Sequence, residues 1–263
     1  QVVGVGGVGT LANVQSIASG FNHTCALAGG GIYCWGKNIN GSLGNGGNVN
    51  SNTPVQVLTL TTGVLGIAAG GEHTCAMKDG SVWCWGYNNK GQLGDSTTVS
   101  NNSPVQVKGL GGVGTLANVG ILTASNANTC ATANGASVCW GYNTYGQNGD
   151  TTTADSPIPV PVNTYASGVS RMAASGSGHH VCGLVNGNMN CWGFNTTAQI
   201  GDNTTVNKSA PTQTLTMTSG VHEISAGGAH SCALSSGFVK CWGQNTVGQV
   251  GDNTTVNRSQ PVS

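Results

Sequence analysis

Five copies of one cysteine-bearing unit span the 263 residues of this chain. The tripeptide Cys-Trp-Gly begins at Cys34, Cys84, Cys139, Cys191 and Cys241, and a second cysteine precedes each copy by nine residues, at Cys25, Cys75, Cys130, Cys182 and Cys232. Successive units are 50, 55, 52 and 50 residues apart, so all ten cysteines belong to the repeat. Self-similarity at a period of this size is typical of solenoids, propellers and arrays.

Each unit has the pattern of β structure. In the first unit the runs 23–27 (HTCAL) and 32–36 (IYCWG) are short and bounded by Gly or Asn. A segment that starts with Pro54 (PVQV) and the run 66–70 (GIAAG) follow. Four short strands per unit without helical periodicity predict an all-β β-propeller of four-stranded blades, with residues 1–263 as a single domain.

The register of the central hairpin follows from its turn. The midpoints between paired cysteines are Gly29-Gly30, Asp79-Gly80, Asn134-Gly135, Asn186-Gly187 and Ser236-Gly237. Such dipeptides favour two-residue type I′ turns, and Ser-Gly is the weakest of the five. In this register the two cysteines of a unit face each other at a non-hydrogen-bonded position, with Cα atoms about 4.5 Å apart. Disulfides span roughly 4.4–6.8 Å, so we predict one bond inside each hairpin.

The alternatives for paired cysteines are reduced buried thiols or a metal site. Zinc requires four converging ligands, which two cysteines opposed across one strand pair do not supply. Disulfides indicate an oxidising compartment, so we expect a secreted or cell-surface protein. The opening segment 5–14 (VGGVGTLANV) recurs as 110–119 (LGGVGTLANV), so we interpret it as part of the repeat in a mature chain and not as a signal sequence.

Composition excludes several classes of function. Charged residues make up 6% of the chain, against about 25% in average soluble domains. Eight Lys and Arg balance eight Asp and Glu, so no polybasic nucleic-acid surface is expected. The sequence contains no stretch of 18 apolar residues, so membrane insertion is not expected. A net charge near zero favours association between molecules.

The second unit carries a recognisable motif. Its sequence GGEHTCAMKDGSVWCWGYNNKGQLGD, residues 70–95, resembles the RCC1 (regulator of chromosome condensation) repeat, and the resemblance extends over essentially the whole chain. It implies a β-propeller, usually with seven blades, whereas this chain has five units. Pro261-Val262-Ser263 match the start of the PVQV strand and Gln1-Val2 match its end. We therefore expect the two termini to complete one strand and close a five-bladed ring, with joining between molecules as the alternative.

The family's known functions carry over poorly. They include a guanine-nucleotide exchange factor on chromatin, a plant UV-B photoreceptor and a secreted inhibitor of β-lactamase. An exchange factor acts inside the cell and on chromatin, which conflicts with five disulfides and with the absence of a basic surface. The tryptophans of the photoreceptor correspond here to Phe21, Gly71, Asn126, Gly178 and Gly228. No functional residue is transferred.

One histidine position recurs in four units, at His23, His73, His180 and His230, with Asn128 in the fifth. A ring of imidazoles is one way to hold a metal. A side chain repeated in every blade more often stabilises every blade, so we interpret these histidines as structural hydrogen-bonding groups.

One acidic position recurs at Asp95, Asp150, Asp202 and Asp252, with Asn45 in the first unit. Calcium requires several clustered oxygen ligands, and one carboxylate per unit is too few. We interpret these residues as Asx-turns, in which the side chain accepts a backbone N–H.

The repeated tryptophans are Trp35, Trp85, Trp140, Trp192 and Trp242, each next to a cysteine and so on the opposite face of the sheet. We expect them to pack between blades, with stacking on sugars as the alternative. Trp83 occurs in one unit only and is expected at the surface.

No nucleophile lies next to a base in the sequence, and His179-His180 and His222-Glu223 are isolated. We predict no catalytic, cofactor-binding or metal-binding residue. The expected function is a non-enzymatic extracellular scaffold for surface assembly, adhesion or protein interaction, with self-association included. The alternatives are a carbohydrate-binding, lectin-like propeller and a secreted protein inhibitor of an enzyme.

Overall fold

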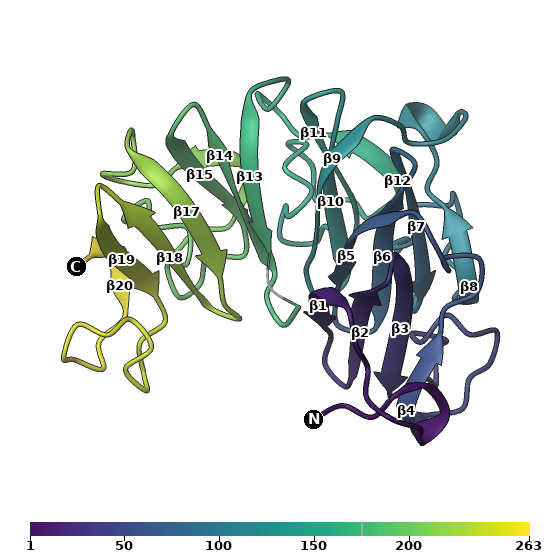
Figure 1. Cartoon of the computed structure of the whole chain (residues 1–263). Helices are drawn as coiled ribbons and strands as arrows, with labels where there is room; N and C mark the ends of the chain where they lie inside the picture. Colours follow the sequence, from purple (N-terminus) through teal and green to yellow (C-terminus); the bar gives the residue numbers. More distant parts are fainter. Residues whose placement is uncertain (175) are drawn as a thin grey trace.

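The computed structural model describes residues 1–174 and 176–263, in which strands form five four-stranded antiparallel sheets (Figure 1). In every sheet the strands lie side by side in chain order, and we number these sheets blades 1 to 5. The strands are β1 (Val14–Ser19), β2 (His23–Ala28), β3 (Gly31–Gly36), β4 (Ser51–Gln56), β5 (Val64–Ala69), β6 (His73–Lys78), β7 (Ser81–Gly86), β8 (Asn101–Gln106), β9 (Val119–Ala124), β10 (Asn128–Ala133), β11 (Ala136–Gly141), β12 (Ser156–Pro161), β13 (Val169–Ala174), β14 (His180–Val185), β15 (Asn188–Gly193), β16 (Lys208–Gln213), β17 (Val221–Ala226), β18 (His230–Ser235), β19 (Phe238–Gly243) and β20 (Arg258–Val262). The predicted all-β architecture with four-stranded blades is confirmed.

The first strand of each blade contacts the first strand of the next, from β1 to β5, β9, β13 and β17. These strands are therefore innermost, and β4, β8, β12, β16 and β20 are outermost. Backbone hydrogen bonds link successive blades beside the inner strands: Phe21 N donates to Gly71 O, Gly71 N to Asn126 O and Asn126 N to Gly178 O. We call the interface between two successive blades a joint, and number the joints 1 to 4.

The five blades form an open arc, which differs from the closed ring expected from the chain ends (Figure 1). Among the described residues, no contact comparable to those at the four joints connects blade 5 to blade 1. The first residues do not extend β20, because Val3 pairs with Thr10 in a local bridge around the short 3-10 turn η1 (Val5–Gly7). The similar segment around η2 (Leu110–Gly112) has the same structure, with a bridge between Lys108 and Thr115.

Every central hairpin has the predicted register. Cys75 pairs with Cys84 in the ladder, and the corresponding cysteines pair in the other four blades. Both turn residues have positive φ in all five turns, including Ser236 (51°) and Gly237 (84°). Each cysteine pair is joined by a disulfide, with Cα atoms 4.1 Å apart. The type I′ turn thus brings the two sulfur atoms together in every blade.

The outer strands begin earlier than the proline suggested. β4 starts at Ser51, three residues before Pro54, because Ser51 pairs with Gly36 at the end of β3. β8 repeats this arrangement, with Asn101 opposite Gly86. The prolines lie on the outermost strand, where the missing N–H leaves no ladder partner unsatisfied.

Candidate functional site

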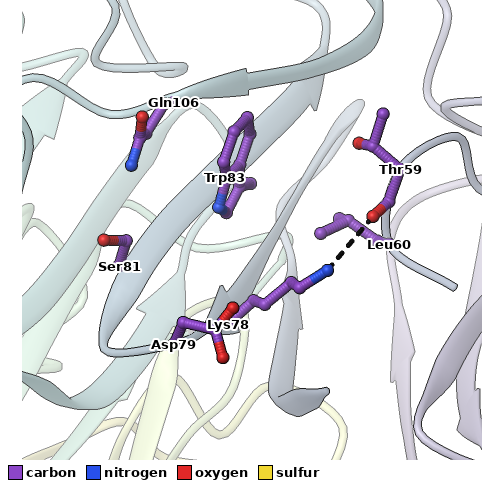
Figure 2. A pocket seen from close by; sticks show the side chains of 7 residues that line it. All are labelled: Thr59, Leu60, Lys78, Asp79, Ser81, Trp83 and Gln106. Atoms are coloured by element: carbon purple, nitrogen blue, oxygen red, sulfur yellow. Dashed lines mark hydrogen bonds between the residues drawn. The ribbon is translucent and has the colours of Figure 1, made fainter. Parts of the chain in front are cut away.

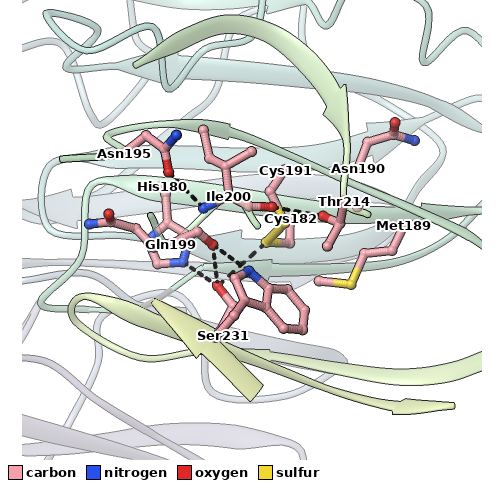
Figure 3. Close-up of a disulfide and its surroundings, with 12 residues drawn as sticks. His180, Cys182, Met189, Asn190, Cys191, Asn195, Gln199, Ile200, Thr214 and Ser231 are labelled. Carbon is pink, nitrogen blue, oxygen red and sulfur yellow. Dashed lines mark hydrogen bonds between the residues drawn. A yellow bond between two sulfur atoms is a disulfide. The ribbon is translucent and has the colours of Figure 1, made fainter. Parts of the chain in front are cut away.

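Three of the four joints repeat one hydrogen-bond unit. At joint 4 the indole of Trp242 and the hydroxyl of Ser231, both in blade 5, donate to the backbone oxygen of Gln199 in blade 4, at 2.8 and 2.9 Å (Figure 3). At joint 2 Trp140 and Thr129 donate to Gln92 O in the same way. At joint 1, Trp85 and Thr74 donate to Ser42 O. One backbone oxygen therefore fixes each blade against the next.

A histidine of the preceding blade completes this unit. His180 Nε2 lies 2.8 Å from Ser231 Oγ, and His73 Nε2 lies 2.8 Å from Thr129 Oγ1. Since the hydroxyl proton points to the carbonyl, the network assigns the imidazole proton to Nε2, which donates to the hydroxyl oxygen. Burial lowers the pKa of His73 to about 3 and that of His180 to about 4, so both rings are neutral. The hydrogen-bonding interpretation is confirmed here and for His23, which bonds Thr74 at 2.8 Å.

Joint 3 departs from the pattern on both sides. Blade 4 has Val181 where the other blades have Thr or Ser, and blade 3 has Asn128 in place of histidine. Asn128 Nδ2 donates within its own blade, to Trp140 O at 3.0 Å and Asn148 Oδ1 at 2.7 Å. Trp192 Nε1 still donates to Gln147 O at 2.9 Å. The loss of the hydroxyl and the loss of the histidine thus occur together.

A buried asparagine organises the long loop of each blade, a role that the sequence analysis missed. Asn88 donates to Asp95 Oδ1 and to the backbone oxygens of Thr97 and Val99, and its own side-chain oxygen accepts from Leu93 N. The equivalent residues are Asn38, Asn143, Asn195 and Asn245, and all five are fully buried. The signal was present in the sequence, since Cys-Trp-Gly-x-Asn recurs in all five units.

The acidic residues act in the same loops. Thr97 N donates to Asp95 Oδ1 at 3.0 Å, and Asp150, Asp202, Asp252 and Asn45 accept from the backbone in the same manner. The Asx-turn interpretation is therefore confirmed. Hydrogen bonds led by that from the Thr254 hydroxyl lower the pKa of Asp252 to about 2, and Arg258 adds to the effect. In the part of the chain that the structure describes, no group of three or more His, Cys, Asp or Glu side chains is placed to hold a metal ion.

The repeated tryptophans pack between blades as predicted, with one exception. Trp85, Trp140, Trp192 and Trp242 are fully buried against the preceding blade. Trp35 is only half-buried, because no other blade of the described residues packs against this side of blade 1. We call the surface around Trp35, Val14 and Ile17 the first end face.

The opposite end of the arc is open as well. We call the surface of blade 5 around Leu234 and Val239, which face each other in the ladder, the second end face. Val239 is 64% exposed, whereas Val82 at the same place in blade 2 is 0% exposed. On the first end face Ile17 is 69% exposed, compared with 8% for the equivalent Ile224. Each end face therefore exposes apolar side chains that the joints bury.

A cluster of aromatic side chains lies at joint 3, where no repeat predicted it. The rings of Tyr145 and Phe194 are 4.7 Å apart, and His179 contacts both tyrosines, Tyr142 and Tyr145, at 5.6 and 5.5 Å. Beside it, Lys90 Nζ lies 5.2 Å from the Tyr142 ring centre and pairs with Asp155. Burial lowers the pKa of His179. At joint 1 an ion pair between Lys37 and Glu72 occupies the equivalent place, so this surface varies from joint to joint.

A pocket of about 390 Å³ lies on the outer side of joint 1 (Figure 2). It is lined by the half-buried Trp83 of β7, by Lys78, Asp79 and Ser81 around the β6–β7 turn, by Gln106 of β8 and by Leu60 from the linker after β4. Lys78 Nζ donates to Thr59 O at 3.3 Å across the mouth of the pocket. Trp83, expected at the surface, thus forms one wall of a pocket.

Blades of four antiparallel strands in chain order around an axis define a β-propeller. The model of the regulator of chromosome condensation (RCC1) repeat matches residues 29–77, 79–121 and 186–234, and a second model of this repeat matches 14–42 and 64–92. The chain belongs to the RCC1-repeat family. No helix among the described residues has the length and apolar character needed to cross a membrane.

Several solved structures share this fold. Human WBSCR16 has a TM-score of 0.79 at 23% identity, over 95% of this chain and 66% of that one. Prp20p from Saccharomyces cerevisiae, described with its binding properties to Gsp1p and histones, has a TM-score of 0.76 at 22% identity, over 95% and 62%. The ectodomain of the receptor kinase CR4 from Physcomitrella patens has a TM-score of 0.52 at 22% identity, over 89% and 53%. The chain thus spans just under two thirds of the first two proteins, and at these identities the likeness concerns the fold alone.

Proposed function

We propose that this chain is a non-enzymatic extracellular scaffold, with residues 1–263 acting as one domain that binds proteins and assembles with copies of itself through its two end faces. The observation that carries the proposal is the pair of exposed apolar side chains, Ile17 and Val239, at the two ends of the arc. Exposed apolar surface that equivalent positions bury elsewhere in the same molecule is typical of an interaction site.

The two end faces are complementary halves of a joint. The first end face carries Thr24 and Trp35, which correspond to the hydroxyl and indole donors at joints 1, 2 and 4. The second carries His230 and Gln249, which correspond to the histidine and to the residue whose backbone oxygen accepts. A second copy that docks head to tail would rebuild the hydrogen-bond unit and bury Ile17 near Val239. The occupant of each end face in this proposal is therefore another copy of the chain.

The extracellular setting rests on the disulfides. Five bonds within hairpins persist only where the surroundings are oxidising. The receptor-kinase ectodomain from P. patens offers an example of this fold outside the cell. The net charge of zero also favours association over mutual repulsion.

Sedimentation velocity of two single variants tests the assembly. Ile17→Lys removes the first end face and leaves the second intact, and Val239→Lys does the reverse. Because both side chains are exposed in the single copy, neither change should affect folding. We expect the wild type to associate with rising concentration, each variant alone to remain monomeric, and an equimolar mixture to form one-to-one dimers.

Val99→Lys is the matched control, since Val99 is an exposed valine far from both end faces, and this variant should associate as the wild type does. A wild type that stays monomeric, or a mixture of the two variants that never dimerises while the wild type associates, contradicts the proposal.

A further inference from the structure

We propose that the pocket around Trp83 binds a carbohydrate, with one face of a pyranose ring against the indole. The pocket belongs to joint 1 and shares no residue with the two end faces, so the inference stands apart from the proposed assembly. Its volume of about 390 Å³ falls in the range of small-ligand sites, roughly 300–1,000 Å³.

The polar groups in this pocket are unused within the protein. The indole N–H of Trp83 and the side chains of Asp79, Ser81 and Gln106 form no hydrogen bond with any other described residue, and all four line the pocket. Together they supply a carboxylate acceptor, a hydroxyl, an amide that both donates and accepts, and an indole donor. Donors and acceptors in one concave site suit a ligand rich in hydroxyl groups.

The other blades show that the frame of the propeller does not require this arrangement. In blade 4 the positions of Trp83 and Gln106 are taken by Asn190 and Gln213. Asn190 Nδ2 donates to the Tyr165 hydroxyl at 3.0 Å, and Gln213 Nε2 donates to Met189 O at 2.9 Å. Both side chains are therefore bonded within the protein, whereas those of the Trp83 pocket remain available.

Blades 3 and 5 carry Val138 and Lys240 at the position of Trp83. With Asn190 in blade 4 and Tyr33 in blade 1, four different residues thus replace the tryptophan in blades that fold in the same way. The indole at joint 1 is specific to blade 2, and a blade does not need a tryptophan at this position in order to fold.

The face of an indole can hold a sugar ring, and the hydrogen-bonding groups around it favour a ligand rich in hydroxyl groups. The face of the ring carries partial negative charge, which attracts the partly positive C–H groups on one side of a pyranose. The hydroxyl groups of the sugar extend outward from that ring, where Asp79, Ser81 and Gln106 offer partners. Lys78 is held by Thr59 O at 3.3 Å, and its charge stands beside that of Asp79, so the pocket has no net charge to select an ionic ligand.

Titration with simple saccharides tests the inference. The probes are the methyl glycosides of glucose, galactose and mannose, together with N-acetylglucosamine, followed by calorimetry and by indole fluorescence. We expect saturable binding of at least one probe, in the millimolar range typical of a single small ring at about −4 kcal/mol. Trp83→Val should weaken that binding at least about tenfold.

The variants are chosen so that folding is preserved. Trp83→Val copies Val138 of blade 3, and Asp79→Asn copies the Asn-Gly turns of blades 3 and 4. Tyr33→Val changes the equivalent residue of blade 1, outside the pocket, and should leave binding unchanged. Retention of five disulfides and an unshifted thermal midpoint verify each fold.

Three results overturn the inference: no probe binds up to its solubility, binding survives in Trp83→Val, or Tyr33→Val weakens it equally. If no saccharide binds and Trp83→Val instead abolishes the binding of a protein, the pocket is a protein-docking site. This result also overturns the inference.

Discussion

Asn128 bonds within its own blade because Val181, its neighbour across joint 3, offers no hydroxyl group. At joints 1, 2 and 4 a histidine meets a hydroxyl at this place, with a separation of 2.8 Å. The two residues are far apart in the sequence, yet each one explains the other. Their pairing shows that the joint, and not the single blade, is the unit on which side chains are matched.

This pairing predicts a strong coupling between the two positions. Asn128→His alone buries an imidazole without a hydroxyl partner and should lower the free energy of unfolding by about 1–3 kcal/mol. The double variant Asn128→His with Val181→Thr restores the pattern of joint 2 and should recover most of that loss. Denaturant unfolding of the two single variants and the double variant measures the coupling. Additive effects of the two changes would show that the residues are independent.

Each disulfide should stabilise its blade separately. A ten-residue loop predicts that replacing Cys130 and Cys139 together by Ser costs about 2–3 kcal/mol. The same replacement of Cys75 and Cys84 is the matched comparison and should cost a similar amount. Thermal unfolding with and without reductant provides the measurement. Peptide mapping of unreduced digests that finds links between different blades would contradict the pairing.

The buried histidines predict a loss of stability in mild acid. His73 and His180 have pKa values lowered by burial to about 3 and about 4, against 6.5 for an exposed histidine. Below pH 6.5 these two histidines therefore bind protons in the unfolded chain but stay neutral in the folded chain. As a result, the free energy of unfolding decreases as the pH falls towards 4. The slope is at most about 1.4 kcal/mol per pH unit for each histidine.

Denaturant titrations between pH 7 and pH 4.5 test this dependence. Asp252, whose pKa is lowered from 3.8 to about 2, stays ionised in the folded protein in this window and contributes to the slope only near its lower end. Stability should be constant above the ordinary histidine pKa, and a flat profile down to pH 4.5 would contradict the burial of neutral rings.

The loop asparagines should be indispensable for loop order. Asn88→Ala leaves Leu93 N without its acceptor and frees the carbonyls of Thr97 and Val99, which should cost about 2–4 kcal/mol. Limited proteolysis should then cut the loop between residues 93 and 101 faster than in the wild type. Asn89→Ala, at the exposed neighbouring position, is the control and should change neither property.

The repeat made much of the structure predictable. The turn dipeptides set the register of Cys75 against Cys84, and the alternation along the strand predicted that Trp85 lies on the opposite face of the sheet and packs between blades. These features are local, so short stretches of sequence decide them. The buried role of Asn88 was equally visible as a repeated letter, although its partners are spread over eleven residues of loop.

Other features depend on contacts between distant segments. Whether the arc closes is decided by how each blade packs against the next, and the exposure of Ile17 and Val239 appears only in three dimensions. The Trp83 pocket likewise arises because a linker residue, Leu60, stands opposite the indole. Sequence spacing alone contains neither relationship.

The sulfur bridges lie within hairpins and never cross a joint. Covalent reinforcement by sulfur is thus confined to the separate blades, while successive blades are held together by hydrogen bonds and by the packing of apolar side chains. Under mechanical load the blades would separate from one another one at a time, each with its disulfide intact, and they could reassemble without any exchange of thiols.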